Sequence, residues 1–246
     1  HSAIYIRDDR GIAGPRDLAG RLVGVREFTM TAALVARGML EDEFGLRSQD
    51  MRWCYGRADA TDDVPIARVL PRDVEIEKIG DDETLSDLLA EGRIDAMIAY
   101  KPPKAYVAGV PHVRRLFEDC PPLERDYYRR SGHFPIMHLI GVRRETLARE
   151  PGLAVSLCDA FQQALDYSQA RLLETQASYT MLPWNAAVAA RLKADFGPLW
   201  RYGLKDNLEA IRTLCRYSLA QGIAGRAVEP EELFAPETID WMAQAA

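Results

Sequence analysis

The chain has 246 residues, of which 48% are hydrophobic and 28% are charged, and it carries a formal net charge of −6. This composition is typical of a globular protein and excludes a disordered one. No basic stripe predicts a nucleic-acid partner, and no apolar run approaches the ~20 residues that a membrane helix needs, so we expect neither nucleic-acid binding nor membrane insertion.

Strands and helices alternate over the first 110 residues. We expect strands at 3–6, 21–25, 51–55, 74–79 and 94–99, a helical turn at 15–18, helices at 31–44 and 85–91, and a polar, proline-bearing stretch at 56–73. Thr29 or Thr31 should cap the first long helix and Thr84 the second, and Gly45 and Gly92 should end them. The alternation predicts an α/β fold with a mostly parallel, doubly wound sheet flanked by helices.

The second half of the chain has a different character. We expect strands at 113–117 and 134–142, separated by a charged segment at 118–130, and then helices at about 151–178, 185–193 and 205–221. The simplest organisation is two lobes: a smaller inserted α/β lobe at 17–110, and a larger lobe made of 1–16 and 111–246. Because a strand begins almost at the first residue, which is not Met, we expect the larger lobe to be incomplete at its N-terminus.

The four cysteines predict no metal or redox chemistry. Cys54, Cys120, Cys158 and Cys215 are widely spaced and form no CxxC pair. Structural thiols are the plainer interpretation. We expect no metal and no other cofactor.

A first candidate site lies where the strand at 21–25 gives way to the helix at 31–44. The start of a helix offers free N–H groups and a partial positive charge, which suits an anion. Arg26, Thr29, Met30 and Thr31 are therefore candidate substrate-binding residues for a carboxylate. The alternative is plain helix capping.

A second candidate site follows the strand at 94–99. Ligands of open α/β sheets bind outside the carboxyl ends of the strands. Tyr100 and Lys101 stand there and could contact an anionic or phenolic ligand. The alternative is a polar surface loop stiffened by Pro102 and Pro103.

Two histidines make the third candidate site. His138 shares the apolar face of the expected strand at 134–142, and it is our candidate for a catalytic general acid or base. His133 is a candidate substrate-binding residue that we expect to be exposed. The alternative for His138 is a core histidine with a hydrogen-bond partner.

Several stretches together resemble the 4,5-dihydroxyphthalate decarboxylase family, a branch of the type 2 periplasmic-binding-protein fold. The resemblance runs nearly from end to end and rests on the segments 1–5, 30–33, 37–38, 42–45, 84–86, 92–96, 113–117, 126–130, 134–138 and 230–238. It implies a two-lobed protein and non-oxidative, metal-independent loss of CO₂ from an aromatic dicarboxylate with phenolic hydroxyls. The partner would be a small aromatic or organic carboxylate, and a homo-oligomer stays open.

A rival interpretation is a protein with the same fold that binds its ligand without catalysis. A solute-binding protein of the transporter type would use the same cleft for a small organic anion. The enzyme interpretation implies the cytoplasm and the binding interpretation the periplasm, and an export signal at the true N-terminus would discriminate between them.

Overall fold

The computed structural model describes residues 1–62, 71, 74–198 and 200–243. The chain forms two compact units. Unit 1 contains residues 1–137 and 213–227, and unit 2 contains residues 138–212 and 228–246. Part of the expected stretch at 56–73 lies outside the described residues.

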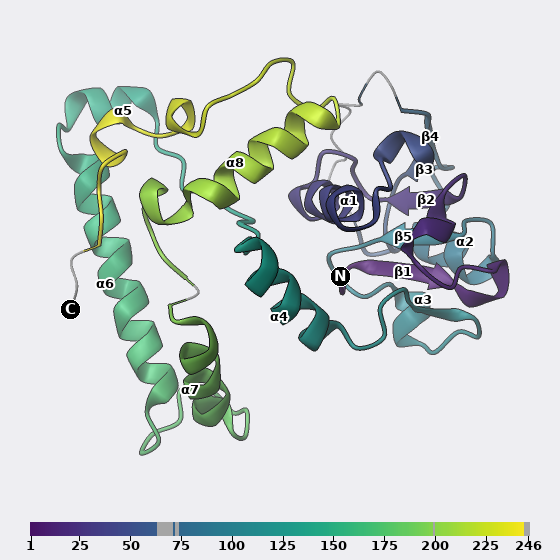
Figure 1. Ribbon diagram of the computed structural model, residues 1–246, viewed down its shortest axis with the longest axis horizontal. Helices are drawn as coiled ribbons and strands as arrows, with labels where there is room; N and C mark the ends of the chain where they lie inside the picture. The colour runs from purple at the N-terminus through teal and green to yellow at the C-terminus, as the bar shows by residue number, and fades with distance from the viewer. Residues whose placement is uncertain (63–70, 72–73, 199, 244–246) are drawn as a thin grey trace. The chain divides into compact units, whose positions relative to one another are not determined.

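Unit 1 is built on one six-stranded sheet (Figure 1). Its strands are β1 (Ile4–Arg7), β2 (Leu22–Val25), β3 (Arg52–Tyr55), β4 (Ile76–Lys78), β5 (Ala96–Ile98) and β6 (Val113–Arg115). They lie side by side in the order β4-β3-β2-β5-β1-β6. The pairs β4–β3, β3–β2 and β2–β5 are parallel, whereas β1 runs antiparallel to both of its neighbours. The expected α/β class and mostly parallel sheet are confirmed.

Helices cover both faces of the sheet. The helices of unit 1 before residue 138 are α1 (Thr31–Phe44), α2 (Leu85–Glu91), α3 (Lys104–Val107) and α4 (Cys120–Ser131). Successive strand residues point to opposite faces, so Ile4 and Ile6 of β1 pack in the core that contains α1, while Tyr5 packs in the core that contains α2 and α3.

The start of α1 differs from the expectation. Gly45 ends the helix with a φ of 70°, as predicted, but Met30 is the N-cap residue and no side chain caps the first turn. The prediction that Thr29 or Thr31 caps this helix is therefore wrong. Thr84 does cap α2, because its side chain accepts a hydrogen bond from the backbone N–H of Asp87.

Two segments near residue 130 are defined by the structure. The charged segment at 118–130, for which no element was predicted, is mostly helix α4, which has prolines in its first turn, where a missing N–H costs nothing. The segment at 134–142 is not a strand, so that prediction is wrong. Periodicity predicts a strand only where a partner strand exists, and none of the described strands pairs with this segment.

Unit 2 is helical in its described part. It contains α5 (Arg144–Arg149), α6 (Leu153–Leu173), α7 (Asn185–Phe196) and the first half of α8 (Leu204–Ala220). Short 3₁₀ turns follow at Pro230–Leu233 and Pro236–Thr238. Residues 1–16 and 111–137, which we expected to share a lobe with this part of the chain, lie in unit 1, because β1 and β6 belong to its sheet.

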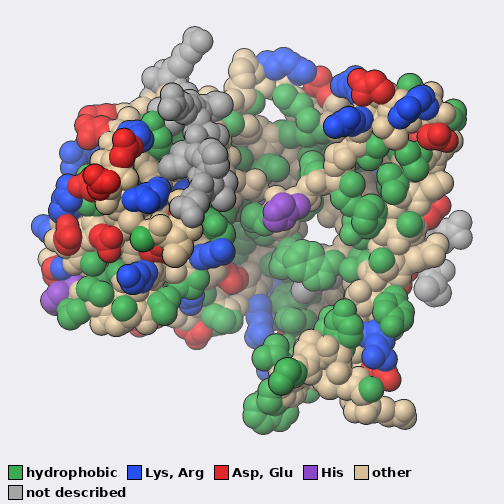
Figure 2. Space-filling model, turned by 180° about the vertical axis from the view of Figure 1, so that it is seen from behind, with side chains coloured by type: hydrophobic (Ala, Val, Ile, Leu, Met, Phe, Trp, Pro, Cys, Tyr) green, Lys and Arg blue, Asp and Glu red, His purple; other side chains and the backbone are tan. Residues whose placement is uncertain are grey.

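Unit 2 carries many exposed apolar side chains. Of the 21 residues in α6, only Ala154 is buried. Figure 2 shows apolar side chains spread over this unit, whereas charged side chains gather on the visible face of unit 1. The large apolar side chains that unit 2 exposes include Tyr167, Tyr179, Met181, Leu182, Trp184 and Trp200. No described helix is both long and apolar enough to cross a membrane.

Candidate functional site

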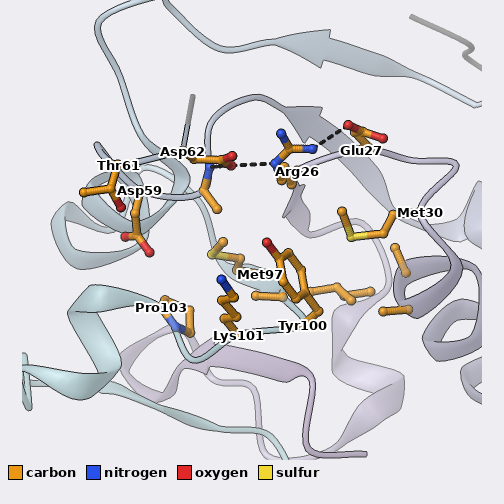
Figure 3. A pocket seen from close by; sticks show the side chains of 15 residues that line it. Arg26, Glu27, Met30, Asp59, Thr61, Asp62, Met97, Tyr100, Lys101 and Pro103 are labelled. Carbon is orange, nitrogen blue, oxygen red and sulfur yellow. Dashed lines mark hydrogen bonds and ion pairs between the residues drawn. The ribbon is translucent and has the colours of Figure 1, made fainter. Parts of the chain in front are cut away.

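A pocket of about 200 Å³ opens in unit 1 at the carboxyl ends of the parallel strands (Figure 3). Pockets for drug-sized ligands usually hold roughly 300–1,000 Å³, so this one suits a smaller molecule. Its wall comes from the ends of β2 and β5, the loop after β3 and the start of α1. The lining residues are Arg26, Glu27, Met30, Ala32, Ala33, Ala58, Asp59, Thr61, Asp62, Met97, Ile98, Ala99, Tyr100, Lys101 and Pro103.

The start of α1 forms one side of the pocket. Met30, Ala32 and Ala33 line it. The N–H groups of the first helical turn have no acceptor within the helix, and no side chain caps them. Two of these three side chains are small alanines, and the positive end of the helix faces the pocket, so this wall favours an anion.

Arg26 lies on the wall with two carboxylates. Its Nε donates a hydrogen bond to Asp62 Oδ2 at 2.6 Å, and its Nη1 pairs with Glu27 (Figure 3). The hydrogen bond with Asp62 raises the pKa of Arg26. Arg26 therefore stays charged, but much of its charge is already offset by these neighbours.

Lys101 and Tyr100 form the opposite wall. Both side chains are exposed, and the Nζ atom of Lys101 lies 5.5 Å from the centroid of the Tyr100 ring, within the range of a cation–π contact. Together with Met30 and Met97, the Tyr100 ring gives the pocket an apolar surface. The pocket therefore combines apolar surface with the positive charge of Lys101 and with carboxylates that can accept hydrogen bonds from hydroxyl groups.

The structure brings together four of the residues expected at the site. Arg26 and Met30 from the first candidate site and Tyr100 and Lys101 from the second line a single pocket. Parallel strands β2 and β5 are neighbours, so the residues that follow them meet at one edge of the sheet. Thr29 and Thr31 flank Met30 and do not line the pocket themselves.

His133 lies away from this pocket. It is buried, with 6% of its surface exposed, so the prediction that it is exposed is wrong. Its Nδ1 lies 3.0 Å from the Tyr127 hydroxyl, and its ring contacts the Tyr217 ring. Burial lowers the pKa of His133. These contacts are those of a core histidine.

His138 is exposed and belongs to unit 2. The expected strand that would present it is absent, so the argument that His138 lies on the apolar face of a strand no longer applies. Its catalytic role stays a prediction.

Sequence reasoning missed the acidic side of the pocket. Glu27 follows the expected Arg26 directly, and Asp59 and Asp62 come from the loop after β3. Since β3 is parallel to β2, its carboxyl end lies at the same edge, and polar residues after Tyr55 were the available signal. In the described part of the chain, no group of three or more His, Cys, Asp or Glu side chains is placed to hold a metal ion.

Two curated proteins are similar to this chain in sequence. One, named 4,5-dihydroxyphthalate decarboxylase, comes from Comamonas testosteroni and is 34% identical over 242 residues, covering 98% of this chain and 73% of that protein. The other carries the same name, comes from Pseudomonas putida, and is 39% identical over 130 residues, covering 52% of this chain and 50% of that protein. No family model matches the chain.

Solved structures give weaker likenesses. The periplasmic sulfonate-binding protein SsuA from Methylobacillus flagellatus matches with a TM-score of 0.48 and 14% identity, over 96% of this chain and 63% of that one, so this chain spans less than two thirds of it. SsuA from Escherichia coli matches with a TM-score of 0.42 and 15% identity, over 96% and 69%. Both TM-scores lie below 0.5.

Proposed function

We propose a reaction for this chain, which belongs to the 4,5-dihydroxyphthalate decarboxylase family: it removes one carboxylate as CO₂ from a hydroxylated aromatic dicarboxylate. The substrate would be 4,5-dihydroxyphthalate or a close analogue, and the product a protocatechuate-like monocarboxylate. The observation that carries the proposal is the 34% identity, over 98% of this chain, with a protein named for that reaction. The pocket in unit 1 supports it from its geometry.

The pocket offers a distinct partner to each part of such a substrate. The start of α1 would hold one carboxylate on its free N–H groups, and Lys101 would add a positive charge. The aromatic ring would lie against Met30, Met97 and Tyr100. Asp59, which also lines the pocket, could accept a hydrogen bond from a phenolic hydroxyl.

The reaction requires one proton for each CO₂ released. The bond between the ring and the departing carboxylate breaks, its electron pair goes to the ring carbon, and that carbon takes up a proton from a general acid. If the proton arrives first, the hydroxyl para to that carbon supports the keto-like cation, and loss of CO₂ restores the aromatic ring. His138 is our candidate for the acid.

The test is to incubate the purified protein with 4,5-dihydroxyphthalate labelled with ¹³C in its carboxyl groups and to measure labelled CO₂ and the monocarboxylate product. Phthalate is the matched control, because it has both carboxylates and no para hydroxyl, and we expect no product from it. His138→Gln should lower kcat by at least about 100-fold if His138 is the acid. His112→Gln, at an exposed histidine paired with Asp8, should keep full turnover.

The binding alternative predicts a different result. If 4,5-dihydroxyphthalate raises the melting temperature of the protein but yields no product, the decarboxylase proposal is wrong and a solute-binding role is favoured. Full turnover by His138→Gln would remove His138 from the mechanism and leave the reaction in place. With the enzyme proposal we propose a cytoplasmic location, which cell fractionation of the native host would test.

A further inference from the structure

Arg37 of α1 is a buried cation without a carboxylate partner. Its side chain is 1% exposed, and no Asp or Glu among the described residues pairs with it. Burial lowers its pKa to about 9, so the group is still protonated at neutral pH. Burying a charge is costly unless the charge makes strong hydrogen bonds, and the contacts that Arg37 makes are therefore informative.

Two of these contacts hold a single residue, Phe28. The Nη2 atom of Arg37 donates a hydrogen bond to the backbone oxygen of Phe28 at 2.6 Å. The guanidinium carbon lies 3.6 Å from the centroid of the Phe28 ring, which is a close cation–π contact. Arg37 therefore contacts both the backbone and the side chain of Phe28.

Phe28 belongs to the loop that forms one wall of the pocket. Arg26 and Glu27 precede it, Met30 follows it, and all three of these line the pocket. The loop itself is closed by a hydrogen bond of 3.4 Å from the Met30 N–H to the Glu27 oxygen. A shift of Phe28 would move the lining residues on both sides of it.

Gln221 holds Arg37 from the other side. It follows the last residue of α8, is 2% exposed, and accepts a hydrogen bond of 2.7 Å from Arg37 Nε. Its Nε2 donates to the backbone oxygen of Leu34 at 3.0 Å. Both ends of the amide are therefore bound to α1, which orients the oxygen toward the guanidinium.

We propose that Gln221 and Arg37 are positioning residues for the pocket. Gln221 orients the Arg37 guanidinium, Arg37 holds Phe28, and Phe28 fixes the loop at 26–30 that presents Arg26, Glu27 and Met30. Neither residue lines the pocket, so their effect on binding is indirect. The consequence for substrate rests on the proposed function, while the consequence for the loop does not.

The first measurement is hydrogen exchange of the backbone amides in residues 26–34. Gln221→Met keeps the length of the side chain and removes both hydrogen bonds. We expect the amides of Met30 and Leu34 to exchange about tenfold faster, because a buried donor on Arg37 loses its acceptor. Gln221→Glu retains an acceptor for Arg37 and should restore slow exchange at Met30.

Tyr217→Phe is the matched control. It also removes a hydrogen bond between α8 and α1, from the Tyr217 hydroxyl to Asp42 Oδ2 at 2.6 Å, but this bond does not involve Phe28. If Gln221→Met speeds exchange at 26–34 no more than Tyr217→Phe does, or speeds it equally throughout unit 1, the proposal is wrong. Should Gln221→Met not fold, Phe28→Leu, which removes the ring beneath the guanidinium, carries the same expectation for Met30 and Leu34.

The second measurement separates this inference from the proposed function. With 4,5-dihydroxyphthalate, Gln221→Met should raise KM by about tenfold and change kcat less than about threefold, while Tyr217→Phe should leave both unchanged. If neither the parent nor the variants turn over, the proposed function fails, and the exchange result still decides the positioning role. If the parent is active and Gln221→Met leaves KM unchanged, the proposed effect of Gln221 and Arg37 on ligand binding is wrong.

Discussion

Gly38 should be the position in α1 that least tolerates a methyl group. A Cβ atom added there would lie 2.4 Å from both Cδ2 and Cε2 of the Tyr217 ring, whereas carbon atoms in contact normally lie ~3.5–4.0 Å apart. The ring cannot withdraw easily, because it is 1% exposed and its hydroxyl is bound to Asp42. Gly38→Ala must therefore push α8 and α1 apart or displace the ring.

Two opposing effects set the magnitude. Overpacking in a core costs about 1–3 kcal/mol, and the severe overlap at Gly38 favours the upper end. Alanine is about 1 kcal/mol more favourable than glycine inside a helix. We expect Gly38→Ala to lower the free energy of unfolding by about 2 kcal/mol, although the same change on an exposed helix face would raise it.

Urea unfolding followed by circular dichroism tests this sign reversal. In a Tyr217→Ala background the overlap is gone, and Gly38→Ala should then stabilise the protein by about 1 kcal/mol. The difference between the two backgrounds measures the clash. A Gly38→Ala protein as stable as its parent, or an equal effect in both backgrounds, would refute the reasoning.

Three further predictions concern the cap of α2, the buried histidine and the charge of the pocket. Thr84→Ala removes the acceptor for the Asp87 N–H and should lower the melting temperature by ~2–4 °C, while Thr84→Ser should not. Burial lowers the pKa of His133 below its ordinary 6.5, so His133 takes up a proton at a higher pH in the unfolded chain than in the folded protein. The stability that depends on neutral His133 is therefore complete above pH 6.5 and is lost as the pH falls below 6.5. The urea midpoint should therefore drop between about pH 7.5 and about pH 5.5 more steeply in the parent than in His133→Gln, and equal slopes would contradict the assignment. Glu27→Gln removes a negative charge that pairs with Arg26 and should tighten binding of 4,5-dihydroxyphthalate about fivefold in calorimetry at low salt, with a smaller gain at high salt; weaker binding would show that Glu27 contacts the ligand favourably.

Local chemistry explains which elements the sequence could predict. Helix α1 matches its expected bounds, because Gly45 readily takes the positive φ that ends a helix. No hydroxyl group caps its start, so the expectation that Thr29 or Thr31 is the cap was wrong. The segment at 134–142 shows a different failure: it is rich in apolar residues, but a strand also needs a partner, and pairing is not a local property.

The same distinction holds for the pocket. Arg26 and Lys101 could be found because each follows an expected parallel strand, and such strand ends share one edge. Asp59 and Asp62 required knowledge that β3 is the next neighbour of β2. The roles of Arg37 and Gln221 depend on a contact between residues 184 positions apart, which spacing along the chain cannot indicate.

The reversed direction of β1 has a practical consequence for probing the protein. Because β1 is antiparallel to β5, its first residues lie beside the end of β5, and the N–H of Ala99, a pocket-lining residue, donates a hydrogen bond of 2.9 Å to the oxygen of Ala3. The start of β1 therefore forms part of the rim of the sheet that carries the pocket. A small fluorophore attached there should report binding directly, whereas a bulky one risks obstructing it.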